Sequence, residues 1–549
     1  MVIVLSMEKV EKTGVYQPIS LLQVLPFDGV VRDVIYDYIP YIKGVESPII
    51  DTWVLQRLRY LYQLQLAHLV YPSATHTRFN HSLGVMHVAY RFMSQLLSRI
   101  EVLKNKLPRE QTKVFLNKPK EILVATRIAG LLHDIGHGPF SHSFDKYVLK
   151  NRSYLGYVVG NHEVLGYIIY RDYLRDHIMK VIKNYGGLDA EFVAELLDEA
   201  MKPPHGMRGF TDLEKKGLLS LADYYVPHPD KQAHRLVRMV VRDFLYPADI
   251  VDYLVRDSYF TKAPIGVINM DWLIIQTYIV SHESILQPAI SSKALDDLVR
   301  MLNARRFMYK NVYLHPVNIA FDETMGILLK CDAMREFIAS VIDKMLEGEL
   351  HYYKALTDYS IYGMLHRWSI EEDLDKYCSN VGSEARKALQ SLFEYRKPKW
   401  KKLIRLEFDK EEARHLFTKG IGMDFMEIIE KRIRKELAHK FRSKGVRERD
   451  FKLLAQVIDP YPSSAKEISE YIYIARTIGD RAIDFTVKHL DEFTKEYGIR
   501  GEALFTLYID REKYEKIDDD DLKRMIDYAV TIINEALGKA EEKKMPETA

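Results

Sequence analysis

The sequence predicts a mostly α-helical protein with a smaller C-terminal α/β lobe and short N-terminal strands. Of its 549 residues, 47% are hydrophobic and only 27 are glycine and 20 are proline, which is typical of a helix-rich globular chain. From Ile49 to about residue 440, apolar residues recur mainly at the spacing that places them on one face of a helix. Runs of β-branched residues lie near the two ends instead.

Charge and cysteine content exclude several classes of protein. With 79 Lys and Arg against 77 Asp and Glu, the net charge of +2 excludes a globally basic nucleic-acid coat and an acidic solvating tail. Cys331 and Cys378 are too few for a disulfide framework or a cysteine-based zinc ribbon, and we expect both to be small buried hydrophobic residues. No apolar stretch approaches the roughly 18 residues that span a bilayer, so we expect a cytoplasmic protein with no membrane partner.

The first two segments contain the strands and then the main helices. Residues 1–45 are expected to form strands and turns, with strands at 2–5 and 30–35. Residues 46–330 are expected to form the helical core, which begins with Asp51 and Thr52 as a helix cap. Further helices of the core are expected at 82–100, 121–134, 162–184 and 247–259.

The last two segments complete the expected organisation. Residues 331–454 form a helical extension that contains basic clusters, and residues 455–549 form the α/β lobe. Within the lobe, strands are expected at 472–474 and 503–509 and helices at 475–497 and 519–538.

Eight of the nineteen histidines lie between residues 68 and 162. The densest run is Leu132-His-Asp-Ile-Gly-His-Gly-Pro-Phe-Ser-His142, where an apolar helix ends on His133 and Asp134. An imidazole and a carboxylate at one helix end can point at one cation, and such ligands suit Mn, Fe, Zn or Mg. Glycines on both sides of His137 allow a substrate to approach the backbone closely. The run therefore indicates metal-dependent chemistry.

Three further pieces complete this pattern. His81 begins a helix, and His162 follows Asn161, which is a good helix cap. A third helix, beginning near Pro247, carries a polar stripe made of Asp249, Asp252, Tyr253, Arg256 and Asp257. The alternative interpretation of the stripe is a solvated helix face. Because the stripe contains Tyr and lacks Lys and Glu, the lining of a cavity fits it better.

Together these motifs resemble the HD-domain metal-dependent phosphohydrolases. Three of them are similar to motifs of the deoxynucleoside triphosphate (dNTP) triphosphohydrolases of the SAM-and-HD-domain type: Gln56-Arg-Leu-Arg-Tyr60, His76-Thr-Arg-Phe-Asn-His-Ser-Leu-Gly84 and His133 to His142. The resemblance is strong over about 45–330, weaker through Glu394-Tyr-Arg396 and faint in the C-terminal lobe. It implies an HD-domain helical core without a SAM domain, and a hydrolase of phosphoric ester bonds.

The resemblance also implies a role for each matching residue. The implied metal ligands are His81, His133, Asp134 and Asp249, holding Mn, Fe or Zn, with Mg accompanying the nucleotide. His162 is the implied general acid, oriented by Asp145, because a histidine with a pKa near neutrality can protonate a leaving oxygen.

The remaining implied roles concern the substrate. The phosphate chain is implied to contact His137, His142, Arg78 and Arg305 along a path lined by Tyr253. The sugar is implied to face Gln63, Asp257 and Tyr313, while Leu64 crowds the 2′ position and excludes ribose.

One position departs from the family pattern. The family has Lys or Arg immediately after the last metal aspartate, where this chain has Ile250, and it has Asp where this chain has Pro247. The lost cation weakens the triphosphate assignment without affecting the metal site. Arg57, Arg306 and Lys310 are candidates to compensate for it.

Regulation and assembly are further expectations. Asp51, Gln56 and Arg59 match positions that bind a guanine nucleotide activator in the family, and Arg396 matches a second allosteric arginine. The alternative is an ordinary helix with a structural ion pair. We also expect a homo-oligomer.

Two basic clusters suggest a second kind of partner. Residues 431–449 contain nine Lys and Arg, which fits a solvated helical hairpin better than a nucleic-acid site. The second cluster, a candidate base-stacking site or oligomer edge, comprises Lys397, Lys399, Trp400, Lys401 and Lys402.

Three functions therefore remain in competition. The leading one is hydrolysis of a dNTP to deoxynucleoside and triphosphate. The second is an HD-type phosphatase or phosphodiesterase acting on a different nucleotide, which Ile250 favours. The third is a metal-containing, polyanion-binding scaffold with vestigial activity, which the intact histidine and aspartate set disfavours.

Overall fold

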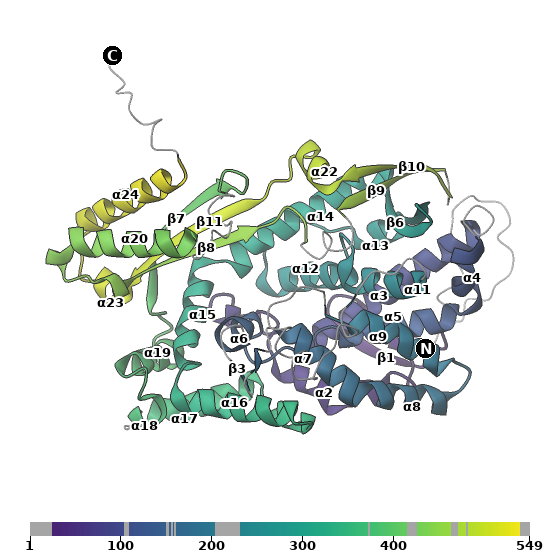
Figure 1. Ribbon diagram of the computed structural model, residues 1–549, viewed down its shortest axis with the longest axis horizontal. Coiled ribbons are helices and arrows are strands. Elements are labelled where there is room, and N and C mark those ends of the chain that lie inside the picture. The colour runs from purple at the N-terminus through teal and green to yellow at the C-terminus, as the bar shows by residue number, and fades with distance from the viewer. Residues whose placement is uncertain are drawn as a thin grey trace, which may run out of the picture.

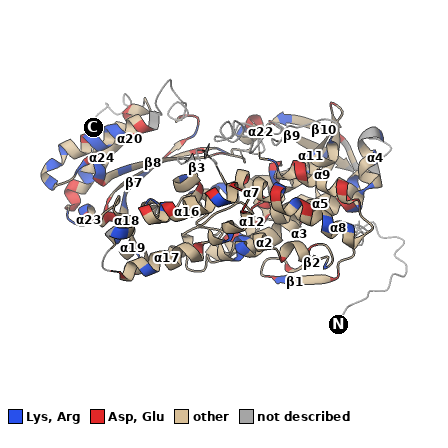
Figure 2. Cartoon of the chain, turned by 60° about the horizontal axis from the view of Figure 1, so that its bottom comes forward, with Lys and Arg blue, Asp and Glu red and all other residues tan. Residues whose placement is uncertain are grey.

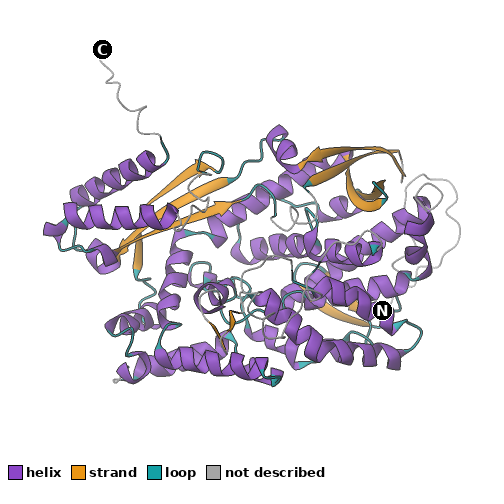
Figure 3. Cartoon of the chain, viewed as in Figure 1, coloured by secondary structure: helices purple, strands orange, loops and turns teal. Residues whose placement is uncertain are grey.

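The computed structural model describes residues 25–103, 109–149, 153–154, 157–158, 161–203, 225, 231–371, 374–413, 425–462, 470–478 and 481–538. Helices dominate it, as expected for an HD-domain helical core, and small sheets lie near the N-terminus and in the C-terminal region (Figures 1 and 3). The strand expected at 2–5 lies outside the described residues. Among the described residues, no helix is long and apolar enough to cross a membrane.

The core is built around two long, buried helices, α3 (Arg78–Leu103) and α5 (Pro119–Leu132). Every residue of α5 from Ile122 to Leu132 is buried, because neighbouring helices cover it on all sides. The helices around this pair are α4 (Arg109–Asn117), α7 (His162–Ile169), α8 (Arg175–Tyr185), α9 (Ala190–Met201), α11 (Gln232–Arg238) and α12 (Ala248–Thr261).

Short elements frame this core. The strands β1 (Gly29–Asp33) and β2 (Asp37–Tyr41) form an antiparallel hairpin in which Gly29 pairs with Tyr41, close to the strand expected at 30–35. A second small hairpin joins β3 (Ser153–Tyr154) to β4 (Tyr157–Val158). The short helices are α1 (Ser47–Ile50), α2 (Trp53–Arg57) and α6 (His142–Phe144), and π turns occur at Asp145–Leu149, Tyr170–Leu174, Met239–Asp243 and Tyr309–Tyr313.

A second group of helices follows. α14 (Leu295–Met308) and α15 (Pro316–Leu328) run between the core and the C-terminal region (Figure 1). The others are α13 (Met270–Ile275), α16 (Asp332–Leu346), α17 (Asp358–Ile370), α18 (Asp375–Cys378) and α19 (Ser383–Phe393). A disulfide joins Cys331 to Cys378, so the expectation of two separate buried thiols was wrong. Their sulfur atoms lie at the start of α16 and the end of α18, which the fold places side by side.

Two sheets connect the C-terminal segment to the core. One is three-stranded and antiparallel, in the order β7 (Trp400–Asp409), β11 (Glu502–Asp510), β8 (Phe451–Ile458). The other is four-stranded, in the order β10 (Arg481–His489), β9 (Tyr471–Ile478), β6 (Ile285–Ser291), β5 (Thr277–His282). β9 pairs parallel to β6, so a C-terminal strand extends a sheet of the core.

The observed lobe therefore differs from the expected one. Its first strand is β7, which lies inside the segment expected to be helical, and the pairing of β7 with β11 crosses the expected boundary at residue 455. Residues 475–497 are not one helix: β9 continues to Ile478, β10 follows, and only α22 (Leu490–Glu496) is helical. The alternation of polar and apolar residues from Asp484 to Lys488 was the strand signal that the prediction missed. The expected helix at 519–538 is α24 (Asp519–Ala536).

α20 (Phe425–Lys440) and α24 pack on the same face of the three-stranded sheet and share a separate hydrophobic core with it. Figure 2 shows mixed charges along both helices. Arg432 pairs with Glu436 and Glu535, and Lys444 pairs with Asp518. In the second basic cluster, Lys399 pairs with Glu384 and Trp400 is only 9% exposed. Neither cluster is an uninterrupted basic surface.

Gly136 lies where the turn after α5 presses against α7. A Cβ atom added to Gly136 would lie 1.9 Å from the carbonyl oxygen of His162 and 2.3 Å from the nitrogen of Gly166. Both contacts are with backbone, which cannot rotate away. Only glycine therefore permits this approach of the two segments.

We predict that Gly136→Ala destabilises the protein by at least the ~1–3 kcal/mol typical of an overpacked core, because the turn must move away from α7. Thermal and urea unfolding measure this. Gly363→Ala is the matched control: Gly363 lies in α17 and its added Cβ would meet nothing within 4 Å. That change should be neutral or stabilising by about 0.5–1 kcal/mol. Equal stability of the two variants would contradict the packing argument.

Candidate functional site

A cavity of about 510 Å³ opens between the core and the C-terminal lobe. Its walls come from α3, the turn after α5, α7, α12, α14, α15 and β8. Every catalytic, substrate-binding and metal-ligating residue expected from the sequence lines it except Asp145, which lies directly behind His162.

The four expected metal ligands converge in this cavity. His81 Nε2 lies 3.0 Å from Asp249 Oδ1, 3.2 Å from His133 Nε2 and 3.8 Å from Asp134 Oδ2. His133 Nε2 in turn lies 3.4 Å from Asp134 Oδ1 and 3.6 Å from Asp249 Oδ1. Two helices, α3 and α12, and the turn after α5 thus bring two imidazoles and two carboxylates together, with His81, His133 and Asp134 forming the tightest group.

Hydrogen bonds fix which nitrogen of each ring faces this point. His133 Nδ1 lies 2.8 Å from the carbonyl oxygen of Gly130, which can only accept, so Nδ1 carries the proton. His81 Nδ1 likewise lies 2.7 Å from Asp252 Oδ2. Two lone pairs on the facing Nε2 atoms would repel each other, so either a proton on His81, whose pKa burial lowers but Asp249 and Asp252 raise to about 10, or a metal cation must lie there. This donor set fits a divalent transition metal.

Asp252 is a functional residue that sequence reasoning placed on the polar stripe but gave no role. It is fully buried and orients His81, as carboxylates behind metal-binding histidines commonly do. Arg256 binds both oxygens of Asp252 at 2.9 and 3.0 Å, and Tyr36 donates a hydrogen bond to it at 2.7 Å. Asp33 then pairs with Arg256 at 2.9 Å. The signal was present in the spacing: Asp252 lies one helical turn from Asp249.

Buried groups also fix the turn that carries His133 to His142. Arg57 donates to the carbonyl oxygens of Ile135 at 2.8 Å and His137 at 2.6 Å. Asp358 accepts hydrogen bonds from the backbone nitrogens of Tyr62 and Phe140, each at 2.6 Å. Arg57 is therefore occupied by backbone and does not reach the cavity, contrary to its candidacy as a phosphate-binding cation.

A second cluster of four residues lies beside the first: His137, His142, Asp145 and His162. His162 Nδ1 lies 2.6 Å from Asp145 Oδ2, and its ring stacks on that of His137 with 3.5 Å between centroids. Burial lowers the pKa of His162, but the charge and hydrogen bond of Asp145 outweigh it, so the net shift is upward. Burial alone would raise the pKa of Asp145, but His162 and its neighbours hold that pKa well below its usual value. His162 is thus favoured as the protonated partner.

The expected phosphate-binding residues surround these clusters. Arg78 donates to Asp134 and, at 2.9 Å, to Ser141 Oγ. Arg305 donates to the carbonyl oxygen of Asp459 at 3.0 Å, and its guanidinium lies 4.5 Å from the ring centroid of Tyr309. Both arginines are buried and line the cavity.

The expected sugar-binding residues form a separate wall. Tyr313 donates to Asp257 Oδ2 at 2.8 Å, and His76 Nε2 lies 2.7 Å from Asp257 Oδ1. Gln63 and Leu64 are partly buried and face the same cavity. The side-chain oxygen of Gln63 is buried without a hydrogen-bond partner, which suits a residue that accepts a hydrogen bond from a hydroxyl of a ligand.

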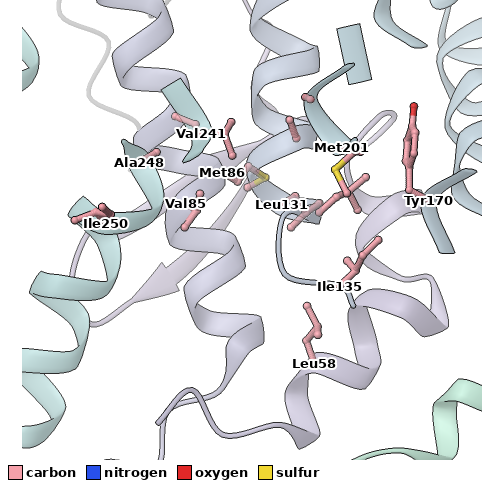
Figure 4. Packing of buried hydrophobic residues seen from close by; sticks show 14 of the residues in the cluster. Leu58, Val85, Met86, Leu131, Ile135, Tyr170, Met201, Val241, Ala248 and Ile250 are labelled. Carbon is pink, nitrogen blue, oxygen red and sulfur yellow. The ribbon is translucent and has the colours of Figure 1, made fainter. Parts of the chain in front are cut away.

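Ile250 lies in the cavity wall and is only 5% exposed. Figure 4 shows Ile250 on α12 among the buried hydrophobic residues. The other two candidates for the missing cation do not line the cavity: Arg306 pairs with Glu502, and Lys310 pairs with Glu407 and Glu502. Two cations that sequence reasoning missed do line it, Lys146 and Arg242. Both lie on π turns, where side chains do not follow the spacing of an α-helix, so the sequence pattern did not indicate them.

The C-terminal lobe also contributes to the cavity, through Gln456 on β8 and through Pro462. Asp322 on α15 faces the same space, and burial raises the pKa of its carboxyl to about 7 despite Lys146 nearby. Neither Gln456 nor Asp322 was a candidate from the sequence, because each lies on an element with no motif around it.

The expected regulatory residues lie outside the cavity lining. Gln56 donates to the carbonyl oxygen of Ile50 at 2.9 Å, and Arg59 donates to Gln56 at 2.8 Å and lies over the ring of Phe79. Asp51 is exposed next to them, whereas Arg396 binds the carbonyl oxygen of Leu69. Gln56 and Arg59 are thus hydrogen-bonded to each other, whereas Arg396 binds elsewhere.

Known proteins resemble this chain in both sequence and fold. A family model described as HD domain matches residues 78–227. The "Deoxynucleoside triphosphate triphosphohydrolase SAMHD1 homolog" of Dictyostelium discoideum is 30% identical over 209 residues, which cover 36% of this chain and 36% of that protein. The "Uncharacterized protein MJ1154" of Methanocaldococcus jannaschii is 30% identical over 289 residues, covering 52% of this chain and 46% of that protein.

Solved structures support the fold over a longer stretch. A crystal structure of a hypothetical protein from Aquifex aeolicus superposes with a TM-score of 0.57 and 22% identity, covering 91% of this chain and 99% of that one. In sequence, by contrast, the chain spans about half the length of the curated relatives it matches first. The chain therefore contains an HD domain, and its distant relatives include dNTP triphosphohydrolases of the SAMHD1 type.

Proposed function

We propose that this protein is a metal-dependent dNTP triphosphohydrolase that releases deoxynucleoside and triphosphate. One observation carries the proposal: the four expected metal ligands, His162 with Asp145 behind it, and the residues expected to face the sugar are gathered at one cavity. A bound divalent ion would lower the pKa of water and polarise a phosphoryl oxygen. His81, His133, Asp134 and Asp249 would hold that ion.

The chain's own residues would perform the remaining tasks. Arg78, Arg305, His137 and His142 would bind the phosphate chain and hold the α-phosphorus in line for attack by water. Asp145 binds Nδ1 of His162, so Nε2 is the atom that would donate a proton to the departing 5′ oxygen. The oxygen of water would bond to the α-phosphorus as the bond from phosphorus to the 5′ oxygen breaks, and the proton that the water loses would pass to solvent, from which His162 is reprotonated.

Ile250 supports one alternative, a phosphatase or phosphodiesterase that acts on another nucleotide with fewer phosphates to neutralise. A panel of dNTPs, NTPs and cyclic nucleotides, tested with Mn, Mg and Fe in turn, separates the two. Inorganic triphosphate is released only under the first proposal. Inorganic phosphate or a nucleoside monophosphate as product would favour the alternative.

Two further properties belong to the same proposal: a site for a nucleotide activator at Asp51, Gln56 and Arg59, and assembly into a homo-oligomer. The hydrolysis rate measured against added GTP tests the activator site. Light scattering measures the oligomeric state.

We predict that Asp134→Ala abolishes both bound metal and hydrolysis, because it removes one of four converging donors. Its melting temperature should also fall, since the ion binds only the folded chain. Elemental analysis, product release and thermal unfolding measure these effects. Glu336→Ala, at an exposed position on α16, is the control. Full metal occupancy in Asp134→Ala would show that the ligand set is wrong.

We predict that His162→Ala keeps metal and substrate binding but loses about 10²–10⁴-fold in kcat, as expected for a general acid. A general acid must be protonated, so activity should fall as pH rises through the pKa of His162. Because Asp145 raises that pKa, Asp145→Asn should move the alkaline limb of the kcat profile to lower pH. An unmoved limb, or a His162→Ala rate above half of wild type, would remove His162 from this role.

We predict that Leu64→Ala raises activity on ribonucleotides more than on deoxynucleotides. A wall at the 2′ position gives specificity by penalising the wrong sugar, and burying an unpaired hydroxyl costs about 1–3 kcal/mol. The ratio of kcat/KM for dATP and ATP measures the effect. The simpler interpretation, that Leu64 only fills the core, would leave this ratio unchanged. Equal hydrolysis of ATP and dATP by the wild-type protein would contradict the dNTP assignment.

A further inference from the structure

Arg242 occupies a distinctive position in the cavity wall. It lies on the π turn Met239–Asp243, shortly before α12, and lines the cavity together with Asp249 and Ile250. Its side chain is 14% exposed. Nη2 donates to Glu163 Oε1 at 2.7 Å, and Glu163 directly follows His162.

Arg242 lines the same cavity as Asp134 and Asp249, two of the expected metal ligands. Burial lowers the pKa of Arg242, but Glu163 and the nearby aspartates outweigh burial and raise it, so the guanidinium stays charged. Among the described residues, its hydrogen-bond partner is Glu163, so other N–H groups of the guanidinium remain for a ligand. Glu163 Oε2 is itself buried without a partner. Arg242 and Glu163 therefore make fewer hydrogen bonds than the two members of a purely structural buried ion pair would make.

The other cations of the cavity also have partners. Arg78 binds Asp134 and Ser141, and Lys146 pairs with Glu323. Arg305 binds a backbone carbonyl and lies against Tyr309. A triphosphate carries several negative charges, and the chain has Ile250 where a phosphate-binding cation was expected. A further cation in the cavity wall would supply the charge that is absent at Ile250.

We propose that Arg242 binds the phosphate chain of the substrate and replaces the cation that is absent at Ile250. Glu163 positions the guanidinium by binding one of its N–H groups. The other N–H groups can bind the phosphate, since a guanidinium can bind phosphate through two parallel N–H bonds. This assignment rests on the proposed function only in placing a polyphosphate in the cavity. It makes Arg242 a substrate-binding residue that comes from a different element than the family pattern predicts.

The test is the affinity of the metal-loaded protein for inorganic triphosphate, measured by calorimetry. Arg242→Gln keeps an amide that can donate to Glu163 and removes the charge. It should bind triphosphate at least about tenfold more weakly, the loss expected for one hydrogen bond to a charged group. KM for the nucleotide should rise with it, while metal content stays at the wild-type level. Arg432→Ala, whose guanidinium pairs with Glu535 on the distant α24, is the matched control and should leave affinity unchanged.

A rescue variant distinguishes charge from structure. Adding Ile250→Lys to Arg242→Gln should restore much of the lost affinity, because the new ammonium lies in the same cavity wall. Unchanged triphosphate affinity in Arg242→Gln, or no recovery in the double variant, would overturn the proposal. If Arg242→Gln does not fold, the wild-type protein still decides: bound triphosphate should slow phenylglyoxal modification of Arg242 but not of Arg432, and equal rates would overturn it.

These outcomes are separable from those of the proposed function. If the wild-type protein binds triphosphate through Arg242 but never releases it from a dNTP, the dNTP reaction fails while the role of Arg242 stands. If triphosphate is released at normal rates by Arg242→Gln with normal KM, the dNTP reaction stands while the role of Arg242 fails.

Discussion

The close approach of the turn after α5 to the start of α7 is the constraint on which the site depends. Gly136 lets the backbone of the turn touch that of His162 and Gly166, so the two histidine clusters become neighbours. Arg57 and Asp358 then hold the same turn from the other side by binding its carbonyl and N–H groups. Without this packing, His133 and His162 would still lie on helices, but they would not face one cavity.

The buried charged side chains behind the site also form a chain in which each one pairs with a side chain of opposite charge. Asp252 orients His81 and is neutralised by Arg256, which is neutralised in turn by Asp33 on the N-terminal hairpin. Leaving any member of such a chain unpaired inside the protein is costly, so its members fix one another's geometry. The short hairpin β1–β2 therefore acts on the site although none of its residues lines the cavity.

Local patterns predicted the helical core, whereas the convergence of the expected metal ligands was implied by the resemblance to the HD-domain phosphohydrolases, because His81 and Asp249 lie far apart in the chain. His133 and Asp134 are adjacent, and Asp249 begins a helix whose polar face is visible in its spacing. The C-terminal region was harder to predict. β7 and β10 alternate between apolar and polar residues, from Ile404 to Asp409 and from Asp484 to Lys488, but both lie in segments that were expected to be helical. β9 pairs with β10 and also with β6, which lies far away in the chain. Gln456 lies on β8, which pairs with β11 in the other sheet, so its place in the cavity depends on long-range packing that no local motif could reveal.

If Arg242 replaces the cation that is absent at Ile250, the same charge enters the cavity from a different position in the sequence. On α12, Asp249 must face the metal site, and the next residue turns about 100° away toward the wall. An apolar side chain there packs well against the core, as Ile250 does. A cation can reach the same space from the π turn that precedes α12, since a π turn carries an extra residue that re-aims its side chains. Motif comparison tests only whether a given position keeps its residue type, whereas substrate binding requires only that the charge arrives at the right point in space.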